Sequence, residues 1–241
     1  YGHDPLGSIK DIKRIGKDNL IPIANSLIFR SKNLVISGKI PLNIDNHIKN
    51  LVTFKQLSEI NLDRSEEKES NYLNAQYIQK SRIVTKAIQT EQVIILLGKA
   101  TIKYENDSDI MLRLLSCYLG YGMSSILFKV LREKHGVVYE AGVYHPIREN
   151  QTPFIMHAST TEEKAILTLK LLNECWEKVI CCDITPEELE ILKIKYRGQM
   201  AHSLQSISQR AEHKVHLLGL GLSIDHDKNI LLRLQNISSK E

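Results

Sequence analysis

Two histidines near the C-terminus have a spacing that metal sites can use. His213 and His216 are three residues apart in a segment of helical periodicity, so both imidazoles can lie on one face of a helix. A catalytic zinc site needs several protein ligands and an open position, and the only acid after Asp227 is the terminal Glu241. The pair either shares a metal ion or consists of two surface histidines, and we favour surface histidines.

Arg132 and Tyr139 form a second candidate pair, which could bind a peptide. A helix that ends near Gly136, followed at once by a strand, would allow both side chains to point at one cleft. A guanidinium and a phenol donate hydrogen bonds to peptide carbonyls and can stabilise an oxyanion. Alternatively, Arg132 caps the helix and pairs with Glu133 or Glu140, while the tyrosine ring lies in the core. The residues alone favour this structural alternative.

A turn with two glycines precedes the predicted helix that carries Arg132. Gly120 and Gly122 are typical of a helix stop, and the serines that follow, Ser124 and Ser125, can supply the N-cap of the next helix. The lysine that completes a phosphate-binding loop is absent, so we expect no nucleotide at this turn.

Hydrophobic periodicity predicts the elements that position these residues. The predicted helices cover residues 20–28, 107–119, 124–134, 165–179 and 186–207. The predicted strands cover residues 34–36, 83–88, 93–97, 137–144 and 154–158. Thr160 with Glu163 and Thr185 with Glu188 have capping-box spacing, which predicts a helix start after each threonine.

The two long helices near the C-terminus have predicted buried faces. The first face consists of Ala165, Leu169, Leu172, Trp176 and Val179. The second consists of Leu189, Leu192, Tyr196, Met200, Leu204 and Ile207. Pairs of strands that alternate with long helices favour an α+β layered domain over a Rossmann-like fold.

The composition argues against several classes of function. The 32 Lys and Arg exceed the 28 Asp and Glu by a formal charge of only +4, and the basic residues are dispersed, so we expect no nucleic-acid partner. No apolar run is long enough to span a membrane, and the start lacks a signal-peptide pattern, so we expect a cytoplasmic protein without a membrane partner. The four cysteines contain no C-x-x-C motif and are expected to be buried free thiols.

The sequence begins at Tyr1 without an initiator methionine, so we expect it to be a piece of a longer polypeptide. Residues 1–241 are interpreted as one domain. Charged residues dominate the stretch near 58–71, which predicts an exposed and mobile connection inside that domain.

Several segments in a fixed order resemble one family of zinc peptidases. In the block from Gln92 to Gly198 these are QVIILLG, LGYGMSSILF, LREKHGVVY, the strand after the long loop, and ITPEELEILKIKYRGQM. Near the N-terminus, HDPLGSIKDIKRIGKDNL and KNLVISG add to the similarity. Together they resemble the C-terminal, non-zinc domain of peptidase family M16, the insulinase or mitochondrial processing peptidase family.

The resemblance implies a fold and different roles for the two halves of the peptidase. Each half of such a peptidase is an α+β, two-layer sandwich of a mostly antiparallel sheet with helices on one face. Two halves close over a chamber that takes unfolded or extended peptides. The other half binds zinc through His-x-x-Glu-His and a downstream Glu, and the Glu inside the motif acts as general base. The non-zinc half supplies an Arg and a Tyr, seven residues apart, which match Arg132 and Tyr139.

This resemblance reverses the preference for a structural role of Arg132 and Tyr139. It also implies that the turn with Gly120, Gly122 and Ser124 touches or admits substrate. His-x-x-Glu-His itself is absent, and in the closest segment, 209–213, Gln209 replaces the first histidine. We therefore expect no metal and no complete catalytic site in this chain, with zinc bound by a partner half.

The functional hypothesis is the substrate-binding half of a zinc metalloendopeptidase, working as a dimer of halves on a peptide substrate. The alternative is a catalytically inactive binding or assembly subunit, since core subunits of respiratory complexes resemble the same family. An unrelated α+β binding domain is the third possibility.

Overall fold

The computed structural model describes residues 6–28, 33–51, 83–87, 89–102, 108–148, 151–181 and 184–238. The chain divides into two compact units, Tyr1–Tyr72 and Leu73–Glu241. The charged connection predicted near 58–71 lies outside the described residues.

The described part of the N-terminal unit contains the helices α1 (Ile9–Ile12), α2 (Lys17–Ile28) and α3 (Ile44–Lys49). The helix predicted over 20–28 is therefore confirmed as part of α2. No residue described in this unit is buried. The strand predicted at 34–36 is wrong: that segment has no regular structure, and Leu34 and Ile36 remain exposed because no neighbouring strand in the described part pairs with it.

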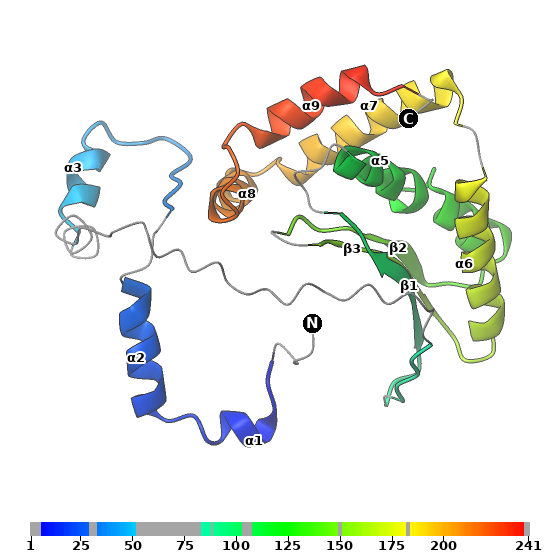
Figure 1. The fold of residues 1–241 in the computed structure, drawn as a ribbon, viewed down its shortest axis with the longest axis horizontal. Coiled ribbons are helices and arrows are strands. Elements are labelled where there is room, and N and C mark those ends of the chain that lie inside the picture. The colour runs from blue at the N-terminus through cyan, green and yellow to red at the C-terminus, as the bar shows by residue number, and fades with distance from the viewer. Residues whose placement is uncertain are drawn as a thin grey trace. The chain divides into compact units, whose positions relative to one another are not determined.

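The C-terminal unit is built on an antiparallel sheet with the strand order β1-β3-β2. Its strands are β1 (Val93–Ala100), β2 (Glu140–Tyr144) and β3 (Pro153–Thr160). Figure 1 shows β3 in the centre of the three. The register places Ala158 of β3 between Ile95 and Ala141, and His157 between Leu96 and Gly142.

Alternation along the strands gives the sheet one packed face and one open face. Phe154, Met156 and Ala158 of β3 are buried on the packed face. On the other face, Ile94 and Leu96 of β1 are 59% and 65% exposed. The strand predicted at 83–88 is not formed over 83–87, which have no regular structure, and residue 88 lies outside the described part.

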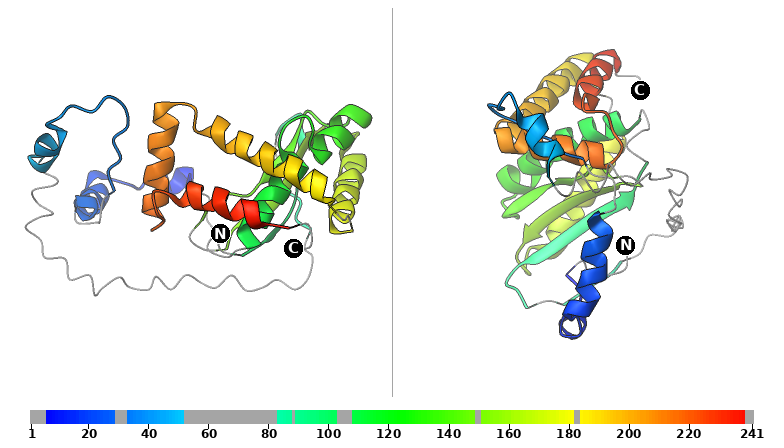
Figure 2. Two further views of the ribbon diagram at one scale, coloured as in Figure 1. Left: turned by 90° about the horizontal axis from the view of Figure 1, so that it is seen from above. Right: turned by 90° about the vertical axis from the view of Figure 1, so that its left-hand side faces the viewer.

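Helices α5 (Ser108–Gly120), η2 (Phe128–Lys134) and α6 (Ala165–Ile180) cover the packed face. Helix η2 is a π-helix, preceded by one short helical stretch at 126–127. Helices α7 (Pro186–Ser203) and α9 (His226–Asn236) pack on the far side of α5, and α8 (Ile207–Gly219) connects them (Figure 2). The predicted α+β sandwich, with an antiparallel sheet and helices on one face, is confirmed.

Two helix predictions need correction. The predicted buried face of α6 is confirmed at Leu172, and Trp176 and Val179 also pack against the core, but Leu169 is 43% exposed. The other buried residues of α6 are Thr168, Leu171 and Cys175, which were not predicted. A threonine can face the core here because its hydroxyl is hydrogen-bonded. The predicted capping box at Thr160 is wrong as well, since Thr160 ends β3 and α6 starts only at Ala165.

The predictions for α7 hold for most of its length. The capping box of Thr185 and Glu188 is confirmed by both reciprocal hydrogen bonds, of 3.2 and 3.0 Å. Leu189, Leu192 and Tyr196 are buried as predicted. Ile207 is exposed instead, because α7 ends at Ser203 and Ile207 opens the next helix.

Candidate functional site

Arg132 and Tyr139 lie at the two ends of a short connection between η2 and β2. Arg132 is in the last turn of η2. We call residues Gly136–Tyr139, which lead from this helix into the sheet, the strap. Gly136 has a φ of +56°, which turns the chain out of the helix at little steric cost because glycine has no Cβ.

The amides of the strap are tied to the elements on both sides of it. The N–H of Val137 donates to the carbonyl of Leu131 at 2.9 Å, which closes the end of η2. The N–H of Tyr139 donates to the carbonyl of Ser159 at 2.9 Å, which extends the β2–β3 ladder. Val137 is itself buried, so the strap is anchored by its side chain as well.

The first two carbonyls of the strap also accept hydrogen bonds. The carbonyl of Gly136 accepts a hydrogen bond from Lys164 Nζ at 3.0 Å. The carbonyl of Val137 accepts one from the buried hydroxyl of Thr160. The strap backbone is therefore held from the helix, the sheet and the β3–α6 corner at once.

In contrast, the side chains of Arg132 and Tyr139 face solvent. Tyr139 is 59% exposed, so the alternative that it is a core residue is wrong. The Arg132 guanidinium lies 5.3 Å from the centroid of the Phe128 ring, a cation–π contact that leaves its N–H groups available. No ion pair among the described residues involves Arg132. A fixed backbone thus presents two exposed hydrogen-bond donors, which suit the carbonyl groups of an extended peptide.

The turn with two glycines has a packing explanation. A Cβ on Gly120 would lie 2.5 Å from the backbone nitrogen of Val143, so only glycine allows α5 to approach β2 this closely. Gly122 has a φ of +70° and open space around it, as a turn residue needs. The capping serine is Ser125, which is buried and accepts from the Phe128 N–H at 3.4 Å, whereas Ser124 is exposed.

This turn and the strap lie at opposite ends of one helix. Gly120, Gly122 and Ser124 precede the helical stretch that begins at residue 126, and Arg132 lies in its last turn. The structure therefore brings Arg132 and Tyr139 to one short connection, and it does not bring the glycine turn to them within the described chain.

The segment that approaches the zinc motif has a structural role. Gln209 is the third residue of α8, and its side chain accepts a hydrogen bond from the Ser206 N–H at 3.0 Å, as part of a capping box. His213 Nε2 lies 2.8 Å from Asp227 Oδ2 of α9. An open hollow of about 710 Å³ borders this helix and is lined in part by Glu212, His213 and His216.

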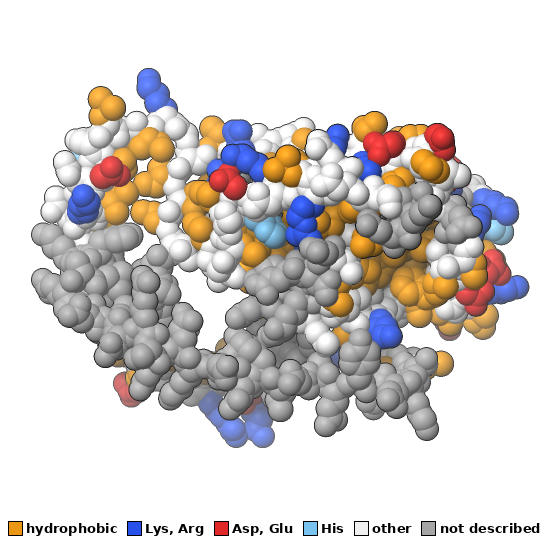
Figure 3. All heavy atoms as spheres, turned by 45° about the horizontal axis from the view of Figure 1, so that its top comes forward, with side chains coloured by type: hydrophobic (Ala, Val, Ile, Leu, Met, Phe, Trp, Pro, Cys, Tyr) orange, Lys and Arg blue, Asp and Glu red, His pale blue; other side chains and the backbone are white. Residues whose placement is uncertain are grey.

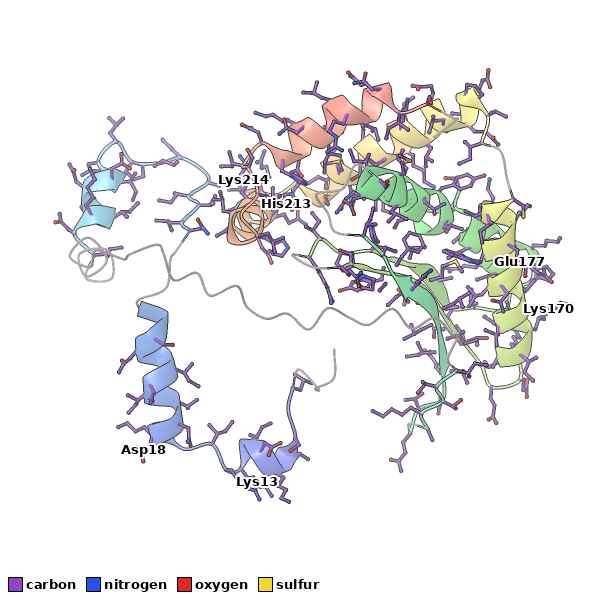
Figure 4. All side chains as sticks on the ribbon, viewed as in Figure 1. Lys13, Asp18, Lys170, Glu177, His213 and Lys214 are labelled. Atoms are coloured by element: carbon purple, nitrogen blue, oxygen red, sulfur yellow. The ribbon has the colours of Figure 1, made fainter. Side chains whose placement is uncertain are left out.

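These residues do not fit a metal site. Figure 4 shows His213 on α8, where its ring nitrogen is engaged by the α9 carboxylate. No group of three His, Cys, Asp or Glu side chains in the described ranges could hold a metal ion. We therefore derive no chemical step through zinc from this chain.

A buried charged cluster was not predicted from the sequence. The Asp109 carboxylate accepts a 2.6 Å hydrogen bond from Arg113 Nε and lies 3.1 Å from His145 Nε2. The other ring nitrogen of His145 lies 3.1 Å from the carbonyl of Pro153. Burial raises the pKa of the neighbouring Tyr196 phenol, which keeps it neutral. The spacing of Asp109 and Arg113 on one helix was the only signal available, and the cluster joins α5 to the end of the sheet.

Two of the cysteines are buried thiols, as predicted. Burial raises the pKa of Cys117 and of Cys175, so neither is a reactive thiolate at neutral pH. Cys181 is exposed, contrary to the prediction, because it follows the last residue of α6. Cys182 lies outside the described residues.

Basic and acidic side chains are interspersed on the face in Figure 3. None of the helices in the described ranges is long and apolar enough to cross a bilayer.

Comparison with known proteins gives the family. The model of the peptidase M16 inactive domain matches residues 33–196, so this chain belongs to that family. An uncharacterized zinc protease of Rickettsia bellii is 27% identical over 213 residues, which are 88% of this chain and 49% of the relative. The chain thus spans about half the length of the curated relatives it matches.

Solved structures share the fold at low identity. The peptidase M16 inactive domain from Pseudomonas fluorescens has a TM-score of 0.54 and 20% identity, over 63% of this chain and 36% of that one. A chain of Complex III2 from Candida albicans has a TM-score of 0.51 and 11% identity, over 63% of this chain and 38% of that one. Both similarities concern the fold alone.

Proposed function

We propose that this chain supplies the substrate-binding, non-zinc half of a zinc metalloendopeptidase that cleaves unfolded or extended peptides. The metal belongs to a partner half, in the same polypeptide or in a separate subunit, and the two halves form the working pair. Arg132 and Tyr139 bind the substrate backbone next to the bond that the partner half cleaves.

The single observation that carries the proposal is the contrast within the Arg132–Tyr139 connection. Every backbone group named for the strap is hydrogen-bonded, yet the side chains of Tyr139 at its end and of Arg132 in the preceding helix turn are exposed and make no ion pair in the described chain. Fixing the backbone of a connection costs conformational entropy, and the exposed side chains gain little for folding. Donors that are held in place before substrate arrives are what oxyanion or carbonyl recognition requires.

Gly120, Gly122 and Ser124 have a weaker part in the proposal. The position of Gly120 against β2 accounts for its residue type without substrate. Gly122, Ser124 and the exposed Met123 remain open to contact, and we place them at the margin of the peptide site.

The second candidate function is a catalytically inactive binding or assembly subunit. The similarity to a chain of Complex III2 favours it, because that fold also occurs in an assembly of another kind. The two candidates differ in one observable: only a peptidase half makes cleavage depend on Arg132 and Tyr139.

The test uses the zinc-loaded assembly of this chain with its metal-bearing half and an unstructured quenched fluorescent peptide. Arg132→Ala and Tyr139→Phe should each lower kcat/KM by roughly 10²-fold or more, because each removes one donor to developing negative charge. Tyr139→Phe removes only the hydroxyl, so its effect reports on hydrogen bonding and not on packing.

Two matched controls keep this test specific. Arg210→Ala makes the same change on exposed α8, and Tyr144→Phe removes a phenol from β2. Both should leave cleavage within about twofold of wild type. Unchanged cleavage in the Arg132 and Tyr139 variants would refute their role, and an assembly with no cleavage at all would favour the assembly subunit.

A further inference from the structure

The β3–α6 corner contains two buried threonines that the peptide-binding proposal does not use. Thr160 ends β3, Thr168 lies in the first turn of α6, and both side chains are fully buried. A buried hydroxyl is unfavourable unless it is hydrogen-bonded, so the partners of these two groups indicate what they do.

Their hydrogen bonds form a chain that ends on the strap. The Thr168 hydroxyl lies 3.3 Å from Thr160 Oγ1 and donates toward it. The Thr160 hydroxyl in turn donates to the carbonyl of Val137. The Thr160 hydroxyl therefore accepts one hydrogen bond and donates another, so its proton and one of its lone pairs are both engaged.

A second branch reaches the neighbouring carbonyl. The same Thr168 hydroxyl lies 2.9 Å from the carbonyl of Lys164, in a bond shared between two acceptors. The Lys164 side chain donates to the carbonyl of Gly136 at 3.0 Å. The two branches hold two consecutive carbonyls of the strap; the first depends on the Thr168 hydroxyl, and the second acts through the Lys164 ammonium.

Neither branch is needed to close the helix or the sheet. The end of η2 is closed by the Val137 N–H, and the ladder is extended by the Tyr139 N–H. The Gly136 carbonyl shares its peptide plane with the Val137 N–H, so that plane is already held. The Val137 carbonyl belongs to the next plane, which would be free to rotate without its bond to Thr160. Rotation of this plane would change where the Arg132 and Tyr139 side chains point relative to each other.

We propose that Thr160 and Thr168 are positioning residues, which fix the strap so that Arg132 and Tyr139 present their donors in one geometry. The inference rests on the proposed function and adds to it two positioning residues that lie outside the substrate site. Thr160 carries the main branch because it is buried, whereas Lys164 is exposed and its bond competes with water.

The experiment compares Thr160→Val, Thr160→Ser and Thr152→Val in the same zinc-loaded assembly. Valine keeps the shape of threonine and removes the hydroxyl, and serine keeps the hydroxyl. Thr152 is the matched control, because it is also fully buried and lies just before the opposite end of β3. Two readouts are measured: amide hydrogen exchange at Val137 and Tyr139, and kcat and KM for an unstructured quenched fluorescent peptide.

Thr160→Val should speed exchange at both strap amides and lower kcat by roughly ten- to a hundredfold, since small displacements of positioning groups have effects of that size. KM should change less, because the donors remain present. Thr160→Ser should restore both readouts toward wild type, and Thr152→Val should alter neither.

Two results would overturn the inference. Unchanged exchange at the strap would mean that the corner does not hold it. Faster exchange with unchanged kcat would mean that holding the strap has no part in the reaction. The Arg132→Ala variant distinguishes failure of the positioning role from failure of the proposed function. If Arg132→Ala loses cleavage while Thr160→Val keeps it, only the positioning role is refuted. If Arg132→Ala keeps cleavage, the proposed function is refuted and the positioning role with it.

Discussion

The strap and helix α8 both contain residues that the sequence marks as candidate site residues, but the side chains of the two regions differ in whether the fold already binds them. In α8, Gln209 completes a capping box and His213 is paired with Asp227, so the unusual residues already have partners. At the strap, the backbone is hydrogen-bonded, whereas the Tyr139 side chain is exposed and the exposed Arg132 guanidinium lies against the Phe128 ring. A side chain that is hydrogen-bonded within the fold has a structural role that accounts for it. An exposed hydrogen-bond donor on a fixed backbone has no such structural role, and a binding function would account for it.

The largest expected effect tests whether the strap is anchored in the core. Leu131, whose carbonyl receives the Val137 N–H, has a fully buried side chain. Leu131→Ala should lower the free energy of unfolding by about 2–5 kcal/mol through lost burial and a residual cavity. Val215→Ala in α8, at a site 37% exposed, should cost less than about 1 kcal/mol. Urea unfolding measures the loss in free energy of unfolding for both variants. Equal losses would contradict the view that the strap is anchored in the core more firmly than α8.

The next effect tests the backbone conformation at the start of the strap. Gly136 has a positive φ, so Gly136→Ala should destabilise the protein by about 1–2 kcal/mol, although nothing lies within 4 Å of the added Cβ. Gly198 lies inside α7 with equally open space and a φ outside the positive region, so Gly198→Ala should stabilise it by about 0.5–1 kcal/mol. Opposite signs in thermal unfolding are the expected result; two changes of the same sign would argue against a conformational requirement at Gly136.

A smaller effect tests the structural role assigned to α8. Ser206→Ala removes the N-cap of that helix and should cost about 1 kcal/mol of stability. Peptide cleavage by the assembly should stay at the wild-type rate, because the capping box does not touch the strap. A loss of cleavage larger than the loss of folded protein would show that α8 has a function beyond its fold.

The main elements could be predicted from the sequence where periodicity and packing agree. Helix α5 and the capped helix α7 each have a hydrophobic pattern that matches what the fold buries, whereas β1 is apolar on both faces and leaves Ile94 and Leu96 exposed. Tyr139 and Arg132 could be placed at one connection because Gly136 marks the end of a helix. These features depend on neighbours in the sequence.

What could not be predicted depends on groups far apart in the sequence. Thr168 of α6 faces the core because Thr160 and the Lys164 carbonyl satisfy its hydroxyl, so a pattern of apolar residues alone misses it. Gly120 is fixed by Val143, on a strand that comes later in the chain. The Asp109 and His145 pair is likewise set by tertiary packing.

The smallest effect concerns pH and His226, the first residue of α9. Burial lowers the pKa of His226 below its ordinary value of 6.5, and Arg113 and His213 act in the same direction, while Asp227 and Asp109 oppose it. Because the folded-state pKa is the lower one, the unfolded chain takes up its proton first as the pH falls. The contribution of His226 to stability is therefore complete above about pH 6.5 and is lost as the pH falls below that value toward the folded-state pKa.

Thermal unfolding between pH 7.5 and 5 measures this contribution against a variant that does not titrate. His226→Gln should reduce the loss of stability on acidification by a modest amount, since His226 is only partly buried and the two carboxylates offset part of the effect of burial. Cleavage at pH 7.5 should be unaffected, as the residue has no contact with the strap. If the variant loses stability on acidification as steeply as wild type, the pH dependence lies elsewhere in the protein.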